Sequence, residues 1–232
     1  EQYTDWVGGA LHGDFGTSIM YRKPVANLLK GKLSITLILG ALALALVIVI
    51  GIPLRVFTAG RKHAVSEQIL NFLNILGISV PGFFLSILLI WVFGLILHWF
   101  APGRFVTMER DPAGFFRYMI FPAIAIAIPQ TCILCKYIRT AVIEEVRADY
   151  VRTARSKGST KNRIMYVHVL KNAIVSVVPL IGMIVSGIFS GSIVIEQVFG
   201  IPGIGRLLIA SVTSRDYPTV QTLVMYIAIV IL

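Results

Sequence analysis

The residue types that most often carry chemistry are scattered along this sequence of 232 residues. The four histidines, at positions 12, 63, 98 and 168, do not follow the H-E-x-x-H spacing of a zinc hydrolase. The phosphate-binding pattern G-x-x-x-x-G-K-[ST] is absent, and Lys157-Gly-Ser-Thr-Lys161 has the wrong order to cradle a phosphate. We therefore expect a chain that is not an enzyme and that holds no metal or cofactor of its own.

The most densely charged segment runs from Lys136 to Lys171 and contains nine of the 21 Lys and Arg residues. It lies between two long apolar runs of a chain that is 56% hydrophobic and only 14% charged. Soluble domains are roughly 25% charged. The composition therefore predicts an integral membrane protein whose basic segment lies in water at the membrane surface.

Uncharged runs predict an all-α, polytopic transmembrane bundle with five visible spans. A run of 36 uncharged residues, Gln68–Gly103, is too long for one straight helix across ~30 Å of hydrocarbon, so we expect a break at Pro81-Gly82. Residues 1–32 are expected to be an extracytoplasmic lead-in, with a short helix over 24–30, and residues 33–232 the membrane domain. The other spans are expected at 33–54, 118–137, 172–195 and 218–232, with loops at 98–117 and 196–217.

The net charge of +10 does not indicate nucleic-acid binding, because no basic stripe with interleaved aromatic residues is present. Cytoplasmic loops of membrane proteins collect Lys and Arg. Twelve of these residues, including Arg55, Arg61 and Lys62, fall on the side of the charged segment, and nine fall on the other side. We therefore place the charged segment in the cytoplasm. Cys132 and Cys135 lie in an apolar run and are expected to be packing residues.

A few polar and small residues stand out within the spans. Asn71 and Asn74 share one helix face, where they would line a polar path or bond to a neighbouring helix. Gln130 has the same two interpretations, because a mid-span amide must face water or a partner. Gly182, Gly187 and Gly191 predict close helix packing. The spans show no carboxylate of the kind that proton-driven carriers use, so the energy for transport is expected to come from another subunit.

The charged segment has the pattern of two helices joined at a glycine. Its first part, 144–157, is amphipathic, and Gly158 suits the left-handed residue that follows a helix end. Ser159 or Thr160 can cap a second helix that is apolar at 164, 167, 169 and 170. We expect this pair, over about 141–170, to lie on the cytoplasmic face between two spans.

The stretch Asp149-Tyr-Val-Arg-Thr-Ala-Arg-Ser-Lys-Gly158 resembles the EAA loop of bacterial ABC-importer permeases, in the dipeptide, oligopeptide and nickel branch. Arg152-Thr-Ala154 stands where the general pattern has E-A-A, and His168-x-Leu170-Lys171 replaces I-x-L-P. Two further segments are similar to outer segments of that family: Gly13–Ser18, and Glu196–Arg206 with Arg215–Pro218. The resemblance implies six spans in a longer polypeptide, of which this sequence lacks the first and the end of the last.

The resemblance implies a multi-pass protein of the bacterial inner membrane that forms the pathway of an ATP-driven importer. Its expected partners are two cytoplasmic ATPase subunits that carry ATP and Mg, a second homologous permease subunit in a heterodimer, an external substrate-binding protein and membrane lipid. Peptide is the first expected substrate, and nickel or another metal chelate the second. A channel or secondary carrier with a lipid-binding basic loop is the alternative. The residues implied in ATPase coupling are Asp149, Tyr150, Arg152, Thr153, Ala154, Arg155, Lys157 and Gly158.

Overall fold

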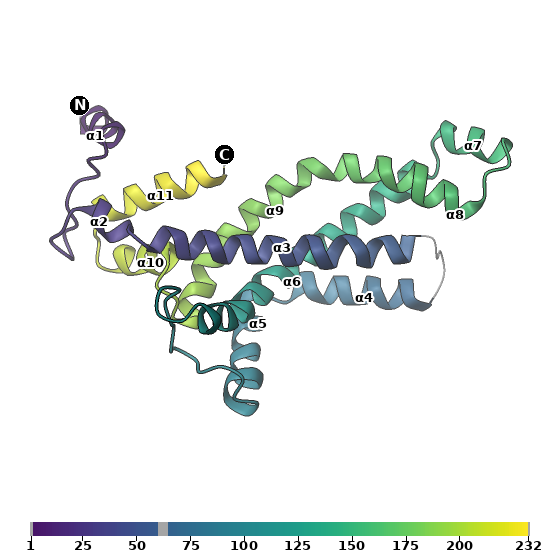
Figure 1. Ribbon diagram of the computed structural model, residues 1–232. Helices are drawn as coiled ribbons and strands as arrows, with labels where there is room; N and C mark the ends of the chain where they lie inside the picture. The colour runs from purple at the N-terminus through teal and green to yellow at the C-terminus, as the bar shows by residue number, and fades with distance from the viewer. Residues whose placement is uncertain (1, 60–64, 232) are drawn as a thin grey trace. The chain divides into compact units, whose positions relative to one another are not determined.

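The computed structural model describes residues 2–59 and 65–231, so Arg61 and Lys62 lie outside the described residues (Figure 1). The elements of the described part are helices, and Thr17 and Pro24 form an isolated antiparallel β-bridge. The elements are α1 (Gln2–Leu11), α2 (Val25–Leu29), α3 (Lys32–Ala59), α4 (Val65–Ser79), α5 (Gly82–Leu89), the π-helical segment η1 (Ile90–Ile96), α6 (Pro112–Glu145), α7 (Asp149–Ser156), α8 (Lys161–Arg163), the π-helical segment η2 (Ile164–Val169), α9 (Leu170–Phe199), α10 (Ile204–Thr213) and α11 (Tyr217–Ile231).

Among the described residues, three helical runs are long and apolar enough to cross a membrane: Val25–Arg55, Pro112–Glu145 and Ile164–Phe199. A fourth candidate is a bent pair, Gln68–Ser79 with Gly82–Ile96, whose halves meet at 98°. The break at Pro81-Gly82 was predicted, because proline removes a backbone hydrogen bond and cannot continue the helix. The expected all-α membrane bundle is confirmed. The segment expected as a fifth span falls in α11, an apolar helix of 15 residues, which is shorter than the ~20 residues a span needs.

The helices form two compact units. Unit 1 comprises Glu1–Ala41, Ser86–Pro122 and Phe189–Leu232, and unit 2 comprises Leu42–Leu85 and Ala123–Ile188. The unit boundaries fall within α3, α5, α6 and α9, so each of these helices contributes residues to both units.

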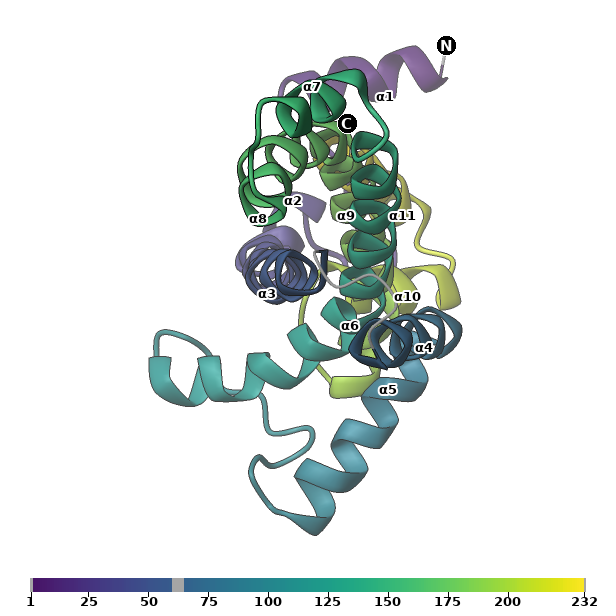
Figure 2. The same cartoon turned by 90° about the vertical axis from the view of Figure 1, so that its right-hand side faces the viewer.

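Unit 1 has an aliphatic core and an aromatic one. The aliphatic core joins α2, α10 and α11 through Val25, Leu29, Ile204, Leu207 and Leu223. The aromatic core forms where the loop 97–111 connects η1 to α6 (Figure 2). There the ring of Phe100 stacks on Phe121 at 4.4 Å between centroids and meets Tyr118 edge-on at 5.6 Å. The hydroxyl of Tyr118 donates to the carbonyl of Phe199 and accepts from the N–H of Gly103, so the aromatic core also fixes the end of α9.

Glu196 holds three helices of unit 1 together. Its side chain is fully buried in the last turn of α9 and accepts the Thr36 hydroxyl of α3 at 2.5 Å. It also accepts the N–H groups of Gly205 (2.8 Å) and Arg206 (3.1 Å) in the first turn of α10. Thr36 in turn accepts the N–H of Ile204 at 3.0 Å. The first N–H groups of a helix have no partner within it, and here two side chains from other helices supply the acceptors.

Asp216 forms a second buried tie in unit 1, between the N-terminal segment and the start of α11. Its carboxylate accepts the Ser18 hydroxyl at 2.5 Å, the Ile19 N–H at 3.0 Å and the Thr219 hydroxyl at 2.8 Å. Burial raises the pKa of Asp216, but these hydrogen bonds outweigh burial and bring the pKa below the ordinary 3.8. The group is therefore held as a carboxylate.

Unit 2 packs the middle parts of the long helices. Arg55, which is buried, donates from Nε to the carbonyl of Cys135 at 3.0 Å, and the Cys135 thiol points at the carbonyl of Gly51 at 3.6 Å. Gly77 leaves the space that the Cys132 thiol occupies. Both cysteines are thus packing residues, as predicted.

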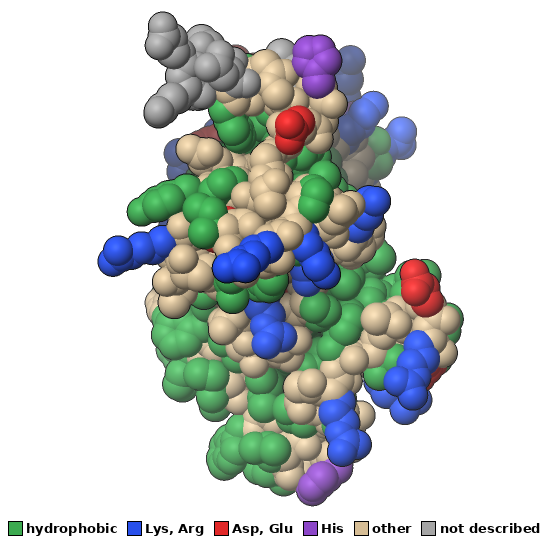
Figure 3. All heavy atoms as spheres, turned by 90° about the vertical axis from the view of Figure 1, so that its left-hand side faces the viewer, with side chains coloured by type: hydrophobic (Ala, Val, Ile, Leu, Met, Phe, Trp, Pro, Cys, Tyr) green, Lys and Arg blue, Asp and Glu red, His purple; other side chains and the backbone are tan. Residues whose placement is uncertain are grey.

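Basic side chains are exposed on both units, among them Arg22, Lys23 and Arg104 of unit 1 and Lys136 and Arg152 of unit 2. Figure 3 shows one face of the molecule, on which Lys and Arg side chains lie beside hydrophobic ones.

Several expected boundaries differ from the structure. The loop expected at 98–117 ends at Asp111, because the Asp111 carboxylate accepts the Gly114 N–H at 3.0 Å and starts α6 at Pro112. The loop expected at 196–217 contains the end of α9 and all of α10. Glu196 therefore lies in the last turn of the helical run Ile164–Phe199, which is longer than the ~20 residues a span needs, and not in a loop.

We predict that Thr36→Val lowers the free energy of unfolding by about 2 kcal/mol, because it removes a donor to a buried carboxylate and leaves the Ile204 N–H without its acceptor. Denaturant unfolding in detergent measures the loss. Thr213→Val, which removes an exposed hydroxyl bonded to its own helix, is the control and should change stability by less than about 0.5 kcal/mol. Equal losses for the two variants would contradict the Glu196 tie.

We predict that the Asp216 tie weakens in acid. A carboxyl group with a lowered pKa stabilises the fold above its unfolded value of 3.8, and this stability is lost as the pH falls through the lower folded value. Asp216→Asn should therefore be less stable than the unmutated protein at pH 7, and the gap should narrow below about pH 4. Unfolding temperatures across this range measure the gap, with exposed Glu109→Gln as control. A gap independent of pH would rule out this source of stability.

Candidate functional site

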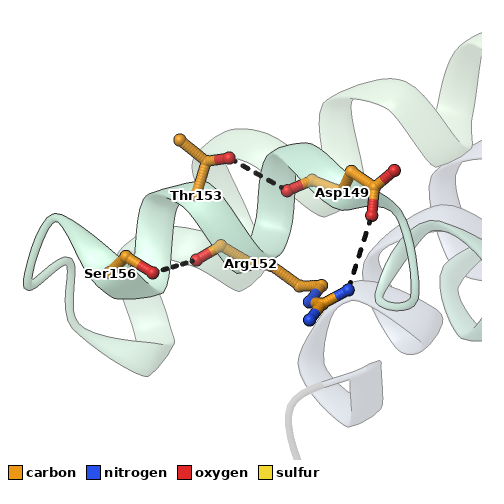
Figure 4. Close-up of polar contacts among 4 residues, drawn as sticks. All are labelled: Asp149, Arg152, Thr153 and Ser156. Carbon is orange, nitrogen blue, oxygen red and sulfur yellow. Dashed lines mark hydrogen bonds and ion pairs between the residues drawn. The ribbon is translucent and has the colours of Figure 1, made fainter.

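Helix α7 is a short, water-facing helix with a defined start and end (Figure 4). Asp149 lies in its first turn, where a negative charge suits the helix dipole. The hydroxyls of Thr153 and Ser156 bond to backbone carbonyls four residues earlier, at 3.2 and 3.1 Å. Gly158 follows the helix end with φ of 80°, as predicted. The N–H groups of Gly158 and Ser159 bond to Arg155 and Ala154, which is the Schellman arrangement.

The two faces of α7 differ in exposure. Val151 is buried and Tyr150 and Ala154 are partly buried, which gives the helix one face against the protein. Arg152 and Asp149 approach to 3.9 Å, but their side chains are 82% and 98% exposed, so the pair adds little stability. The shape of the exposed face is therefore maintained by the backbone hydrogen bonds of α7 and not by the Arg152–Asp149 ion pair. Its residues are Asp149, Arg152, Thr153, Arg155, Lys157 and Gly158.

Tyr150 ties α7 to the ends of two long helices. Its hydroxyl donates to the Glu145 carboxylate of α6 at 2.6 Å and also bonds to Asn172 of α9. Burial, followed by the hydrogen bond to Glu145, raises the pKa of Tyr150 above its ordinary value, so the phenol stays protonated as a donor. Helix α7 also packs against η2. A force on α7 would thus reach α6 and α9.

The pair of helices expected in this segment is built differently. The first helix is not continuous over 144–157, because α6 ends at Glu145 and a turn precedes α7. The second is not separate from the following span. Thr160 caps it, with its hydroxyl accepting the Arg163 N–H at 3.4 Å, and the helix then runs through α8, η2 and α9 without a break. The apolar pattern contains no residue that would stop it before Pro179, so the helix continues into the membrane-length run Ile164–Phe199.

Asn71 and Asn74 lie together in one pocket of unit 2. The pocket has a volume of about 380 Å³ and is lined by α4 and α6, through Asn71, Asn74, Ile75, Ile78, Ser79, Lys136 and Arg139. A second pocket of about 360 Å³ contains Gln130 and shares Ile78 and Lys136 with the first. The polar residues chosen from the sequence therefore lie in adjoining pockets. Lys136 and Arg139 were not chosen, although they follow Gln130 and Ile133 at intervals of three on α6.

Residues 48–232 match the family model described as "Binding-protein-dependent transport system inner membrane component". The chain belongs to this family. It is 34% identical to the oligopeptide transport system permease protein AppB of Bacillus subtilis, over 99% of this chain and 74% of that protein. It is 36% identical to a putative peptide transport system permease protein of Brucella suis, over 97% and 72%.

Family membership makes this chain a multi-pass permease component, as the resemblance implied. A probable peptide ABC transporter permease protein of Sinorhizobium fredii is 30% identical over 98% of this chain and 72% of that protein. The family match covers α7 and both pockets of unit 2, so each belongs to the shared part of the permease.

The three glycines of the expected packing stripe differ in their surroundings. A Cβ atom at Gly187 would lie 2.6 Å from Nε2 of Gln130, so this glycine makes room for the Gln130 amide. A Cβ at Gly182 or Gly191 would meet no described atom within 4 Å. Among the described residues, Gly187 is therefore the position of the stripe that packs closely against another helix, and it lies in the second pocket.

We predict that Gly187→Ala costs about 1 kcal/mol more in the unmutated protein than in a Gln130→Ala background, because the three atoms nearest to the added methyl group all belong to the Gln130 amide. Unfolding free energies of the four proteins give this coupling. Gly182→Ala, which adds a methyl group to open space, should show none. The same cost in both backgrounds would mean that Gln130 is not the residue displaced.

Proposed function

We propose that this chain is a transmembrane pathway subunit of an ATP-driven peptide importer in the bacterial inner membrane. The family description names binding-protein-dependent transport, and the relatives reported above carry peptide or oligopeptide transport in their names. These names favour peptide over nickel or another metal chelate as substrate. Family membership likewise favours an importer over a channel or a self-powered carrier.

The observation that carries this proposal is the construction of α7. One side of the helix is fixed to the protein by Val151 and by the hydrogen bond from Tyr150 to Glu145, while the other side is exposed and basic. A surface of this kind suits docking to acidic groups on a partner protein. We assign it to an ATPase subunit, with Arg152, Arg155 and Lys157 supplying charge. Ala154 allows close approach, and Gly158, with φ of 80°, sets the corner that ends α7.

The same construction suggests how ATP hydrolysis drives transport. Two ATPase subunits, which carry ATP and Mg, close on ATP binding and displace α7. The tie through Tyr150 passes this movement to the end of α6 at Glu145 and to α9 at Asn172. Movement of these helices switches the pathway between outward-facing and inward-facing states. A second permease subunit completes the pathway, and an external binding protein delivers the peptide.

Glu196 does not suit a proton carrier, although it lies in a membrane-length helix. The Glu196 carboxylate is the acceptor in every hydrogen bond described for its side chain. The donors are one hydroxyl and two backbone N–H groups. Protonation would place an O–H among these donors, at the cost of at least one hydrogen bond. We therefore assign Glu196 to the architecture of unit 1 and the energy input to the ATPases.

We predict that Gly158→Val uncouples the importer and that Gly158→Asn does not. Valine is strained at a φ of 80°, whereas asparagine tolerates this conformation, and both side chains enter open space. In proteoliposomes with all subunits, Gly158→Val should lower peptide uptake by about tenfold or more. Backbone strain on the order of 1–2 kcal/mol, which would weaken the contact with the ATPase, corresponds to a loss of this size. Gly158→Asn should keep peptide uptake within about threefold of the unmutated importer's, which corresponds to a difference of under about 1 kcal/mol.

The control is membrane insertion, which should be the same for both variants. Co-purification of ATPase subunits should weaken for Gly158→Val. Normal ATP-driven uptake by this variant would count decisively against α7 as the coupling helix.

A further inference from the structure

A pocket of about 610 Å³ lies in unit 1, where η1, the loop 97–111 and the first turns of α6 meet. This volume is within the range of about 300–1,000 Å³ that is usual for ligand sites. Arg104 of the loop and Arg117 of α6 both line the pocket, together with the rings of Trp99 and Tyr118. The fold thus brings two cations from different elements to one site that also has an aromatic wall.

Both arginines of this pocket can reach a ligand, because the side chains of Arg104 and Arg117 are exposed. Among the described residues, neither guanidinium group makes a hydrogen bond or an ion pair. The acidic residue beside the pocket, Asp111, is already engaged, since its carboxylate accepts the N–H of the lining residue Gly114 at 3.0 Å. The pocket is therefore complementary to an anion, and a guanidinium group matches the geometry of a phosphate.

The pocket lies at the membrane boundary of two apolar helical runs. The bent pair Gln68–Ser79 with Gly82–Ile96 ends beside it, and the run Pro112–Glu145 begins there. Two large lining residues, Leu95 and Trp99, are 57% and 59% exposed. Exposed apolar side chains at the end of a span lie against lipid, and Trp side chains gather where hydrocarbon meets water. Positive charge and lipid-facing surface therefore adjoin in this pocket.

A phospholipid carries both chemical features that this pattern requires. Its phosphate accepts hydrogen bonds from guanidinium groups, and its acyl chains cover apolar side chains at the same boundary. An acidic protein surface matches the two arginines but leaves the exposed apolar side chains beside them uncovered. A phospholipid with a net negative charge fits best, because it brings no cation of its own into the pocket.

We propose that Arg104 and Arg117 bind the phosphate of an anionic phospholipid whose headgroup occupies this pocket. The acyl chains lie against the exposed apolar residues of η1, among them Leu95. The ring of Trp99, which packs on Phe93 with 4.9 Å between centroids, separates the headgroup from the chains. This site makes the protein prefer an anionic membrane, whatever substrate it transports.

The first test measures binding of phosphatidylglycerol, labelled on an acyl chain, to the complete importer in neutral detergent. Arg104→Gln with Arg117→Gln should weaken this binding by about tenfold or more, because charge-assisted hydrogen bonds are lost. Arg104→Lys with Arg117→Lys keeps the charge and should restore part of the affinity. Arg110→Gln, an exposed cation of the same loop outside the pocket, is the matched control and should have no effect.

Phosphatidylcholine, in which a choline cation accompanies the phosphate, should bind to the unmutated importer at least about tenfold more weakly than phosphatidylglycerol. Equal affinities for the two lipids would overturn the proposal. So would a double glutamine variant that binds phosphatidylglycerol as tightly as the unmutated importer.

The second test locates the lipid through a thiol introduced by Val106→Cys, at a residue that lines the pocket. In the complete importer, phosphatidylglycerol should slow the reaction of this thiol with a water-soluble maleimide by at least about threefold, on the order of one hydrogen bond's worth of binding. Adding Arg104→Gln with Arg117→Gln should abolish the protection. Absence of protection by phosphatidylglycerol would refute lipid binding at this pocket.

Two further arms of this test separate the lipid from other anions. Inorganic phosphate should not protect the thiol, and protection equal to that by phosphatidylglycerol would assign the pocket to free phosphate and overturn the proposal. The external binding protein is left out of the first measurements. Protection that appears only when this protein is added would assign the pocket to a protein contact, and this outcome would also overturn lipid binding.

Discussion

The buried carboxylate of Glu196 is the interaction on which unit 1 depends. It belongs to the last turn of α9 and accepts hydrogen bonds from a hydroxyl of α3 and from two N–H groups in the first turn of α10. A carboxylate has enough acceptor positions for all of these donors, and each would be costly to leave without a partner in an apolar surrounding. The glycines nearby follow from this constraint. A Cβ at Gly203 would lie 2.5 Å from the Glu196 carboxyl group, so only glycine admits the carboxylate at the start of α10.

Helices α7 and α9 end with the same pattern of backbone hydrogen bonds. After α9, the N–H groups of Gly200 and Ile201 bond to the carbonyls of Gln197 and Glu196, and after α7 those of Gly158 and Ser159 bond to Arg155 and Ala154. Both ends therefore direct the chain sharply away from the helix and leave few carbonyls without partners. At α7 this device separates a rigid helix from the capped start of the next one, which is why a surface of only 8 residues can have a fixed shape.

Buried charged groups are structural anchors in both units. In unit 1, Glu196 and Asp216 are buried and surrounded by donors, so they act as fixed structural anchors. In unit 2, the buried Arg55 donates to the carbonyl of Cys135, whereas the cations of α7 face outward. Buried, satisfied charges hold a structure together, whereas accessible ones can meet a partner. This contrast underlies the assignment of α7 to the ATPase contact.

The sequence alone determined the features that depend on local interactions. Long uncharged runs make membrane helices, Pro81 breaks one of them, and Gly158 and Thr160 mark a helix end and a helix start, because each effect acts within a few residues. The tertiary structure decided what depends on residues far apart. Thr36 and Glu196 are 160 positions apart, and nothing near Glu196 in the sequence signals that an acid there would be buried. Likewise Lys136 appeared to be one more basic residue at a membrane surface. Only the packing of α4 against α6 places it, with Arg139, opposite the two asparagines, because hydrophobic burial fixes which helix faces meet.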